Sequence, residues 1–567
     1  MAAMLTGCSL GKKQEVTGAD KYPEFLTVDV FDSQANYQGI QQGWFAKLVK
    51  DKFNMQLNII APNVAGGGDA LYDTRCANGN LGDLIFTNAD NGRLNELAVG
   101  DLLLDLTPYM DEEEHLAARK EAITSLAHLT SREGMWAVPS MIAEEAGASE
   151  PTEIEEPTNG ACLRWDLYQK TGGEKIETLE DLLPVLKKMQ EAQPYTSSGR
   201  KAYAFSLFGD WDDNLMQNAG ALGALYGYDP QGYVMLNVEN GDIKSIIEDD
   251  SPYVRALRFL CKANQMGLVD PESPVQGYDA VAQKYTDGAV LYSLWPWLGT
   301  GQYNSERNLA QGKGFATIKI EDARYLCWGN FRNGYENFAV MIGSKTKDPR
   351  RMADFVDWLY SPEGIETSGS PNGNFSGPEG LTWTMENDEP VLTEFGYGAF
   401  VEKKEDLAVP EEWGGGTWSG GISQLNYKAT AFHGEDPERG VPYCYMRWDD
   451  YREKTQNTVQ EEWCKFYDTT LLPIDYFKEQ GKITVVPGNV WESTPDTASI
   501  STIREQCRQT IIDSSWSMVF AESDEEFEEM LQEMQSVLIR LGYKEALAVD
   551  MENAQARYQA ICEARNS

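Results

Sequence analysis

The chain has 567 residues, with 48 Lys or Arg and 89 Asp or Glu, so its formal net charge is −41. A surface this acidic repels nucleic-acid phosphates and does not dock electrostatically on anionic lipid. Because 42% of the residues are hydrophobic and 11% are aromatic, packed domains are favoured over disorder. The length allows two or three cores, and no apolar run is long enough to predict a membrane-spanning helix.

The chain starts with a short apolar run that ends in Leu5-Thr6-Gly7-Cys8. This start resembles the lipobox of bacterial lipoproteins, although no basic residue precedes it. The resemblance implies a lipid on Cys8, a tether up to residue 19, and a location on the extracellular face of the cell membrane. The alternative is a coincidental tetrapeptide. Export would permit disulfides, but the other eight cysteines are scattered and show no C-x-x-C spacing, so we expect free thiols.

The first part of the chain alternates strands with helices. The patterns predict strands over 26–31, 55–60 and 84–87, with helical spacing between them. Such alternation indicates a parallel sheet with helices on both faces, and ligands bind beyond the carboxyl ends of such strands. Polar residues follow two of these ends, which makes Asp32, Asp90 and Asn91 candidate ligand contacts.

Further along, helices are predicted over 179–190, 254–266 and 350–359, and strands over 204–208 and 290–294. Two more helices follow near the C-terminus. Ser523 and Glu526 have the spacing of a capping box at the start of the first one.

Six blocks then occur in a recognisable order: 104–109 (LDLTPY), 134–139 (GMWAVP), 163–168 (LRWDLY), 267–271 (GLVDP), 285–290 (YTDGAV) and 337–342 (NFAVMI). Together they resemble the bacterial extracellular solute-binding proteins of carbohydrate ABC transporters, in the lipid-anchored Gram-positive form. The resemblance implies an α/β, two-lobed periplasmic-binding-protein-like fold with a hinge and a central ligand cleft. It places lobe one at 20–140 plus 318–367, and lobe two at 145–312 plus 370–567.

The resemblance also implies a function. The chain would bind a neutral oligosaccharide and deliver it to the permease subunits of an ABC transporter. It would act as a monomer without cofactor, metal or catalytic activity, with no nucleic-acid partner, and would touch the membrane only through its lipid.

Sugars are bound by aromatic rings that stack on their C–H faces and by polar side chains that hydrogen-bond their hydroxyls. Aromatic residues in polar or Gly-rich loops are therefore candidates, together with their polar neighbours. They are Trp211, Asp212, Trp295, Trp297, Trp328, Tyr335, Asn337 and Trp418. Glu145 is added because the family places a sugar-contacting Glu just after the 134–139 block. The alternative for each aromatic residue is ordinary packing, since Trp is buried on average.

Two other functions stay open. A peptide-binding receptor would share the fold, and a glycoside hydrolase would need two facing carboxylates, which 89 acidic residues could supply. The sequence contains neither G-x-S-x-G nor a phosphate-binding loop, and its three His residues lack zinc-ligand spacing. Alginate-binding relatives carry a calcium loop where this chain has 193–201, a stretch without carboxylates, so we predict no metal there. Acidic glycans are disfavoured because the candidate loops hold no basic cluster.

Overall fold

The computed structural model describes residues 17–65, 68–90, 92–143, 151–331, 333–369, 375–404, 406–488, 493–494 and 496–566. The expectations for Cys8, Asn91 and Glu145 lie outside these ranges. The chain forms two compact units, unit 1 (1–144 with 333–454) and unit 2 (145–332 with 455–567). Within the described ranges, no helix has the length and apolar character needed to cross a membrane.

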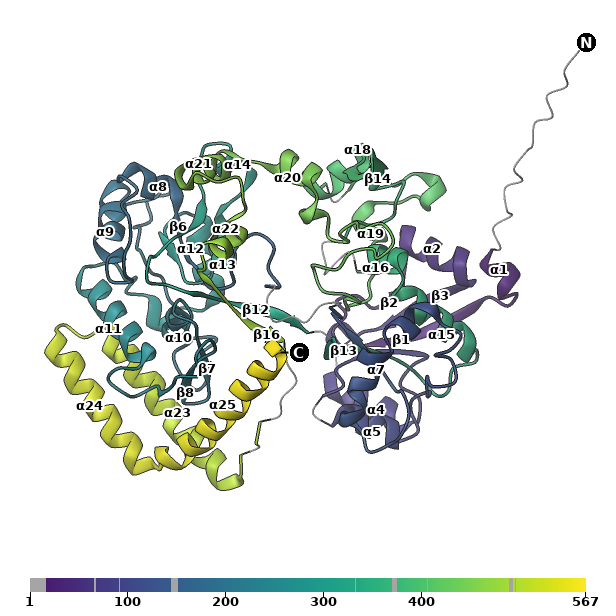
Figure 1. Ribbon diagram of the computed structural model, residues 1–567, viewed down its shortest axis with the longest axis horizontal. Helices are drawn as coiled ribbons and strands as arrows, with labels where there is room; N and C mark the ends of the chain where they lie inside the picture. The colour runs from purple at the N-terminus through teal and green to yellow at the C-terminus, as the bar shows by residue number, and fades with distance from the viewer. Residues whose placement is uncertain are drawn as a thin grey trace, which may run out of the picture. The chain divides into compact units, whose positions relative to one another are not determined.

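Unit 1 is built on a six-stranded sheet with the order β2-β3-β1-β4-β13-β5 (Figure 1). The strands are β1 (Leu26–Asp32), β2 (Gly39–Ile40), β3 (Met55–Ile60), β4 (Leu84–Thr87), β5 (Val138–Ser140) and β13 (Tyr335–Ile342). The first three predicted strands are confirmed to within one residue. In β3, Met55, Leu57 and Ile59 are buried and alternate with half-buried residues, which is the period-two pattern of a strand with one covered face. β4 is buried at all four positions, as expected of a central strand.

The expected parallel sheet is mixed. β1 pairs in parallel with β3 and β4, whereas β13 runs antiparallel to β4 and β5, and β2 runs antiparallel to β3. The alternation of strands and helices that predicts parallel pairing covers only the first part of the chain. β13 joins from more than 240 residues after β4, where no crossover helix fixes its direction.

The helices of unit 1 are α1 (Gly18–Lys21), α2 (Gly43–Phe53), α3 (Pro62–Ala65), α4 (Gly68–Ala77), α5 (Arg93–Val99), α6 (Glu114–Ala118), α7 (Lys120–Ser125), α15 (Pro349–Leu359), α16 (Pro362–Ser368), α18 (Glu394–Gly396) and α19 (Trp418–Gly421), and α20 (Asp449–Thr455) ends it. A hairpin of β14 (Trp383–Glu386) and β15 (Glu389–Leu392) lies among them. The predicted helix 350–359 is α15. Its N-cap is Asp348, whose carboxylate accepts from the Arg351 backbone N–H, and Pro349 is its first residue.

Two segments belong to a different unit from the one expected for them. Residues 318–332 belong to unit 2, and 370–454 belong to unit 1. The described part of the latter packs on the first sheet and its helices. Trp418 stacks on Trp44 of α2, with ring centroids 5.0 Å apart and planes 5° apart. The Asn426 backbone N–H donates to Asp32 at the end of β1 (2.8 Å), and Tyr427 packs on Phe86 of β4.

Unit 2 holds three small sheets, with the orders β10-β6-β11, β7-β8-β9 and β12-β16 (Figure 1). Their strands are β6 (Ala161–Arg164), β7 (Tyr228–Gln231), β8 (Val234–Asn237), β9 (Ile243–Ser245), β10 (Tyr292–Ser293), β11 (Phe315–Ile318), β12 (Tyr325–Phe331) and β16 (Ile483–Gly488). The predicted strand 290–294 is shortened to β10. The predicted strand 204–208 does not form, because Tyr203 and Phe205 make only isolated bridges, to Val290 and Val269.

The helices of unit 2 are α8 (Trp165–Lys170), α9 (Leu182–Ala192), α10 (Gln217–Gly223), α11 (Pro252–Gln265), α12 (Tyr278–Thr286), α13 (Pro296–Tyr303), α14 (Glu306–Leu309), α21 (Thr458–Tyr467), α22 (Pro473–Glu479), α23 (Ala498–Val519), α24 (Asp524–Leu541) and α25 (Tyr543–Asn566). The predicted helices 179–190 and 254–266 are α9 and α11, and the two C-terminal helices are α24 and α25. The Ser523 hydroxyl caps α24 by accepting from the Glu526 N–H (3.1 Å). The Glu526 carboxylate accepts from the Glu522 N–H instead of the Ser523 N–H, so the reciprocal half of the predicted capping box is displaced by one residue.

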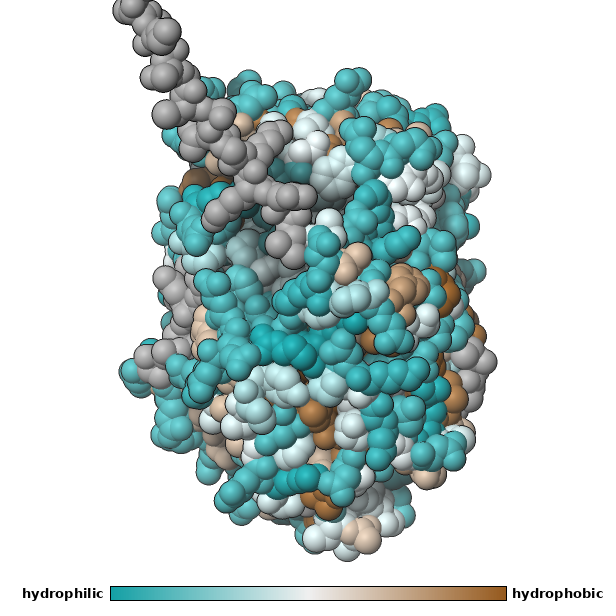
Figure 2. All heavy atoms as spheres, turned by 90° about the vertical axis from the view of Figure 1, so that its right-hand side faces the viewer, coloured by the Kyte–Doolittle hydropathy of each residue, from teal (hydrophilic) through white to brown (hydrophobic). Residues whose placement is uncertain are grey.

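The eight cysteines after Cys8 are free thiols, as predicted, and five of them are buried. Burial suits Cys as a small apolar side chain. The face of the chain shown in Figure 2 is mostly hydrophilic, with hydrophobic residues in small separate patches, in keeping with the acidic composition.

Candidate functional site

An aromatic cluster in unit 2 brings together three of the predicted contact residues. Trp211 lies at its centre, with ring centroids 5.3 Å from Trp295 and 6.0 Å from Trp297. Phe208 packs edge-on against Trp211 at 4.8 Å, and Tyr278 stacks on it at 5.2 Å with an interplanar angle of 27°. We call these five residues the aromatic platform.

The platform has a buried base and exposed faces. Trp295 is only 7% exposed, whereas Trp211 is 40% and Trp297 is 45% exposed. Trp211 and Trp297 therefore keep part of their aromatic surface open to solvent, although Tyr278 stacks on Trp211. The arrangement can therefore receive the apolar face of a ligand.

Local hydrogen bonds hold the platform residues in place. The Ser293 hydroxyl donates to the Trp295 carbonyl (2.6 Å) and accepts from the Gly299 N–H (3.1 Å), which fixes the turn from β10 into α13. Asp210 accepts from the Tyr278 N–H at the start of α12 (2.7 Å). These bonds place Trp297 in the first turn of α13, beside Trp211.

A pocket of about 130 Å³ adjoins the platform, since Trp295 also lines it. Its other lining residues are Thr158, Asn159, Gln217, Gly220, Ala221, Ala224, Asp229, Pro230, Leu326 and Trp328. The Thr158 hydroxyl oxygen is buried and has no hydrogen-bond partner within the described residues. Trp328 is 39% exposed. A buried polar atom left unpaired is costly, so it is a natural place for a ligand hydroxyl.

The polar groups of this pocket are almost all neutral. Asn159 donates its side-chain N–H to the Leu326 carbonyl (3.1 Å), and Gln217 adds a second amide. Burial raises the pKa of Asp229, the one acidic residue in the lining, although Arg557 lies 2.5 Å away and opposes that rise. No Lys or Arg lines the pocket.

Asp212, predicted as a ligand contact, forms hydrogen bonds with other residues of the protein. One carboxylate oxygen accepts from the Trp516 indole N–H (2.8 Å) and the other from the Gln217 N–H at the start of α10 (2.9 Å). Burial raises its pKa. The carboxylate thus connects the loop that carries Trp211 to α10 and α23.

The candidates in unit 1 do not form a comparable cluster within the described residues. Asp32 is 1% exposed and accepts from the backbone of Gln34 and Asn426, and burial raises its pKa to about 7. Trp418 is 7% exposed and lies in the stack on Trp44. Asp90 accepts a hydrogen bond from the neighbouring Asn88 side chain.

Tyr335 and Asn337 both belong to β13, where Tyr335 is half-buried opposite Ser140. The side chain of Asn337 lies outside the described part of the chain.

Several residues of the site carry little signal in the sequence. Tyr278 follows Gly277 at a helix start and resembles any capping segment. Thr158 and Asn159 lie in an acidic, Pro-interrupted stretch that predicts a surface loop, and Gln217 begins an apolar helix. Only the fold brings these positions to Trp295.

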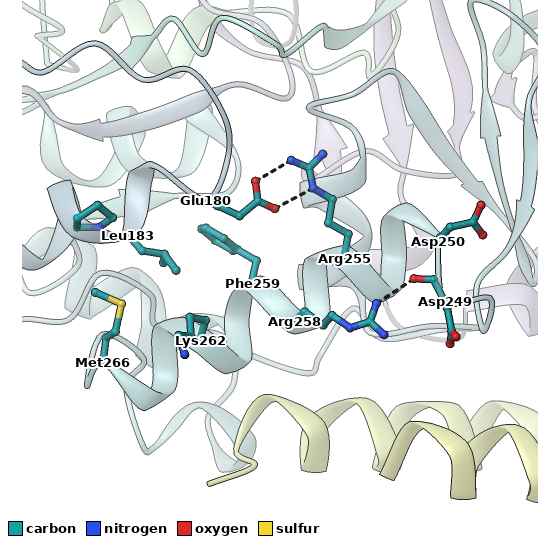
Figure 3. A pocket seen from close by; sticks show the side chains of 10 residues that line it. Glu180, Leu183, Asp249, Asp250, Arg255, Arg258, Phe259, Lys262 and Met266 are labelled. Atoms are coloured by element: carbon teal, nitrogen blue, oxygen red, sulfur yellow. Dashed lines mark hydrogen bonds and ion pairs between the residues drawn. The ribbon is translucent and has the colours of Figure 1, made fainter. Parts of the chain in front are cut away.

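A larger pocket, of about 680 Å³, lies elsewhere in unit 2, along α9 and α11 (Figure 3). Its two Arg side chains have partners within the protein. Arg255 holds Glu180 with two hydrogen bonds (2.9 and 2.8 Å), and Arg258 donates to the Asp249 carbonyl (2.9 Å). Within the described residues, no side chain of this lining has a buried polar atom without a partner, in contrast to Thr158 beside Trp295.

The loop 193–201, for which no metal is predicted, is closed by its own hydrogen bonds. The Thr196 N–H donates to the Arg200 carbonyl (2.8 Å), and the Thr196 and Ser198 hydroxyls lie 2.8 Å apart. Arg200 also pairs with Asp287 (3.2 Å). Across the described residues, no three His, Cys, Asp or Glu side chains converge as a metal site would require.

Three solved structures of similar fold share low sequence identity with this chain. The alginate-binding protein AlgQ2 without calcium ion matches with a TM-score of 0.55 and 15% identity, over 97% of this chain and 100% of its own. The S. pneumoniae ABC-transporter substrate-binding protein FusA in complex with kestose gives 0.54 and 13%, over 94% and 100%. An HMO-binding, ABC-transporter-associated solute-binding protein from Bifidobacterium longum infantis gives 0.53 and 13%, over 94% and 99%.

These likenesses establish the two-lobed fold. A search of curated proteins finds no match. The family model described as bacterial extracellular solute-binding protein matches residues 38–366, which is more than half of the chain. The chain therefore belongs to the bacterial extracellular solute-binding proteins, which work with ABC transporters.

Proposed function

We propose that this solute-binding protein is a receptor for a neutral oligosaccharide, which it binds at the aromatic platform and the adjoining pocket. Trp211 and Trp297 stack on sugar rings, and Trp295 with Trp328 encloses one ring between them. Thr158, Asn159 and Gln217 hydrogen-bond its hydroxyls. The observation that carries the proposal is the pairing of exposed tryptophan faces with a pocket that holds an unpaired, buried hydroxyl.

The chemistry of the lining supports a sugar over other solutes. Hydroxyl and amide groups both donate and accept, which suits ligands that are rich in hydroxyls. Two of the similar structures are described as a complex with kestose and as HMO-binding, which agrees with this class. A neutral glycan is favoured over an acidic one because no cation lines the pocket to balance a carboxylate.

Delivery of the ligand to a permease is expected from the family. We propose that the two lobes close around the sugar for this delivery. Binding free energy would then stabilise the closed form over the open form. A lipid on Cys8 would hold the receptor at the extracellular face of the membrane. The chain acts as a monomer in this proposal, and X-ray scattering with and without sugar would test closure.

The test of the ligand class is calorimetry of the purified protein against neutral oligosaccharides, uronic-acid oligosaccharides and short peptides. Saturable binding of a neutral oligosaccharide is expected, and it should weaken in the Trp328→Ala variant. Binding of peptides without any response to sugars would replace the proposal with a peptide receptor. Preferential binding of uronates would overturn the neutral class.

The enzyme alternative needs its own measurement. Prolonged incubation with each bound oligosaccharide, followed by chromatography, should return the sugar intact. Released fragments would show a glycoside hydrolase, provided that a variant of the site abolishes them.

A further inference from the structure

A separate pocket in unit 1, of about 450 Å³, is not used by the proposed function. It is lined by Leu48 of α2, by Ser361, Pro362, Glu363 and Glu366 at α16, by Pro378, Glu379 and Trp413, and by Asp436, Glu438 and Arg439. The volume falls in the usual range of small-molecule sites. Five carboxyl groups and one guanidinium face this space, so its charge is strongly unbalanced.

Most of these charges already have partners. Arg439 binds Asp436 through Nε (2.6 Å) and Glu379 through Nη1 (2.9 Å). Glu363 pairs with Lys52 (2.7 Å) and accepts from the Trp358 indole N–H (3.0 Å). Arg439, the only guanidinium in the lining of the pocket, is therefore already ion-paired within the protein.

Glu366 is paired more weakly than Glu363, Glu379 and Asp436. Its side chain is 4% exposed, and its Oε1 atom accepts no hydrogen bond from the described residues. The nearest cationic nitrogen is Nη2 of Arg439, 3.5 Å away. A buried carboxyl oxygen in this state is costly unless a further donor reaches it.

Trp413 supplies the apolar wall. The residue is half-buried, and no described aromatic ring packs against it, in contrast to Trp418, which is enclosed by Trp44, Phe395 and Phe400. An indole face beside carboxylates can cover the hydrocarbon part of an organic cation while the charged group meets the carboxylates.

We propose that this pocket binds a small aliphatic amine, with its ammonium group donating to Glu366 and Glu438 and its hydrocarbon part lying on Trp413. An anion is excluded by the five carboxyl groups. A metal ion is disfavoured because no three ligand side chains converge among the described residues. The net charge of −41 adds a long-range attraction for cations.

Binding should release a proton, which gives a signature of the contact with Glu366. Burial raises the pKa of Glu366 to about 8, with Arg439 opposing the rise and Glu379, Asp436 and Glu363 adding to it. A bound ammonium favours the ionised form and lowers that pKa, so affinity should increase as the pH rises from about 6 to about 8.5. The amine itself stays charged across this range, since alkyl ammonium groups titrate near pH 10.

The experiment is calorimetry of the full chain with 1,4-diaminobutane, using 1,4-butanediol as the neutral isostere. We expect saturable binding of the diamine only, weakened at least about tenfold in Glu366→Gln and in Trp413→Ala, and unchanged in Trp297→Ala. Heats measured in two buffers of different ionisation enthalpy should differ for the wild type and coincide for Glu366→Gln.

Circular dichroism establishes that each variant is folded, and Glu438→Gln, at an exposed position, serves if Trp413→Ala unfolds. The proposal is overturned if the diamine gives no saturable heat. It is also overturned if the diol binds equally well, or if every folded variant binds the diamine like the wild type, as a diffuse surface attraction would. None of these results bears on sugar binding in unit 2.

Discussion

Replacing Trp297 by Ala should weaken oligosaccharide binding strongly while leaving the fold intact. The side chain is 45% exposed. Taking the surface of a tryptophan side chain as roughly 250 Å², this leaves about 110 Å² open to a ligand. A sugar ring covering half of that area also buries a similar area of its own, so about 110 Å² leaves water in total.

At about 25 cal/mol per Å², this contact stabilises the complex by about 3 kcal/mol, which is an upper value corresponding to roughly a hundredfold in Kd. We expect a ten- to hundredfold increase in Kd for Trp297→Ala, measured by calorimetry with the sugar that binds the wild type best. The melting temperature without ligand should fall by a few degrees at most, because the substitution also removes the contact of Trp297 with Trp211, and the protein should stay folded.

Phe466→Ala is the matched control. Phe466 is 41% exposed in the same unit and packs edge-on against Trp165, outside the platform. Its loss should leave Kd unchanged. If Trp297→Ala binds the sugar within twofold of the wild type, or if Phe466→Ala weakens binding equally, the platform is not the sugar site.

Three further predictions concern stability and metal binding. Lys284 is buried with Asp270 (2.7 Å) and also pairs with Glu272 (2.6 Å). Lys284→Met should therefore lower the free energy of unfolding, measured by urea titration, by about 3–5 kcal/mol. Lys262→Met, at an exposed position, should change this free energy by no more than about 0.5 kcal/mol. Burial raises the pKa of Glu156 to about 8 in the folded protein, whereas the unfolded chain loses this proton near the ordinary pKa of Glu. Between these two pH values only the folded protein holds the proton, so its stability falls as the pH rises. Glu156→Gln should therefore gain stability over the wild type at pH 8.5 but not at pH 4, and parallel pH profiles would contradict this. Since Thr196 and Arg200 close the loop 193–201, calcium and EDTA should give the same melting temperature, and stabilisation by calcium would show that a metal site exists.

Part of the fold follows from local patterns. Three of the six strands of the first sheet are predicted to within one residue because their apolar patterns, such as the alternation in β3, are visible in the sequence itself. The segment 204–208 has a similar composition, but its neighbours offer only isolated bridges, so it does not become a strand. Whether a segment becomes a strand depends on the neighbouring strand with which it can pair, and the segment's own sequence does not show that neighbour.

The candidate site shows the same limit. Trp211 and Trp418 both lie among polar or Gly residues, and the sequence gives the same reason to select each of them. Trp211 and Trp297 keep exposed faces, whereas Trp418 is buried on Trp44, a residue far away in the chain. An aromatic residue in a polar loop therefore identifies a side chain that has no local partner, and the fold determines whether a distant partner or a ligand covers it.

The net charge of the chain does not locate a binding site either, as a comparison of the two pockets shows. The value of −41 favours a neutral or cationic ligand over an anionic one, but it does not say where. Beside Trp295, the single carboxylate of the lining is matched by Arg557, and the other polar groups are hydroxyl and amide. Around Glu366, five carboxyl groups share one guanidinium. Because pairing within each pocket sets the local potential, one acidic chain can present a site for a neutral sugar and another for a cation.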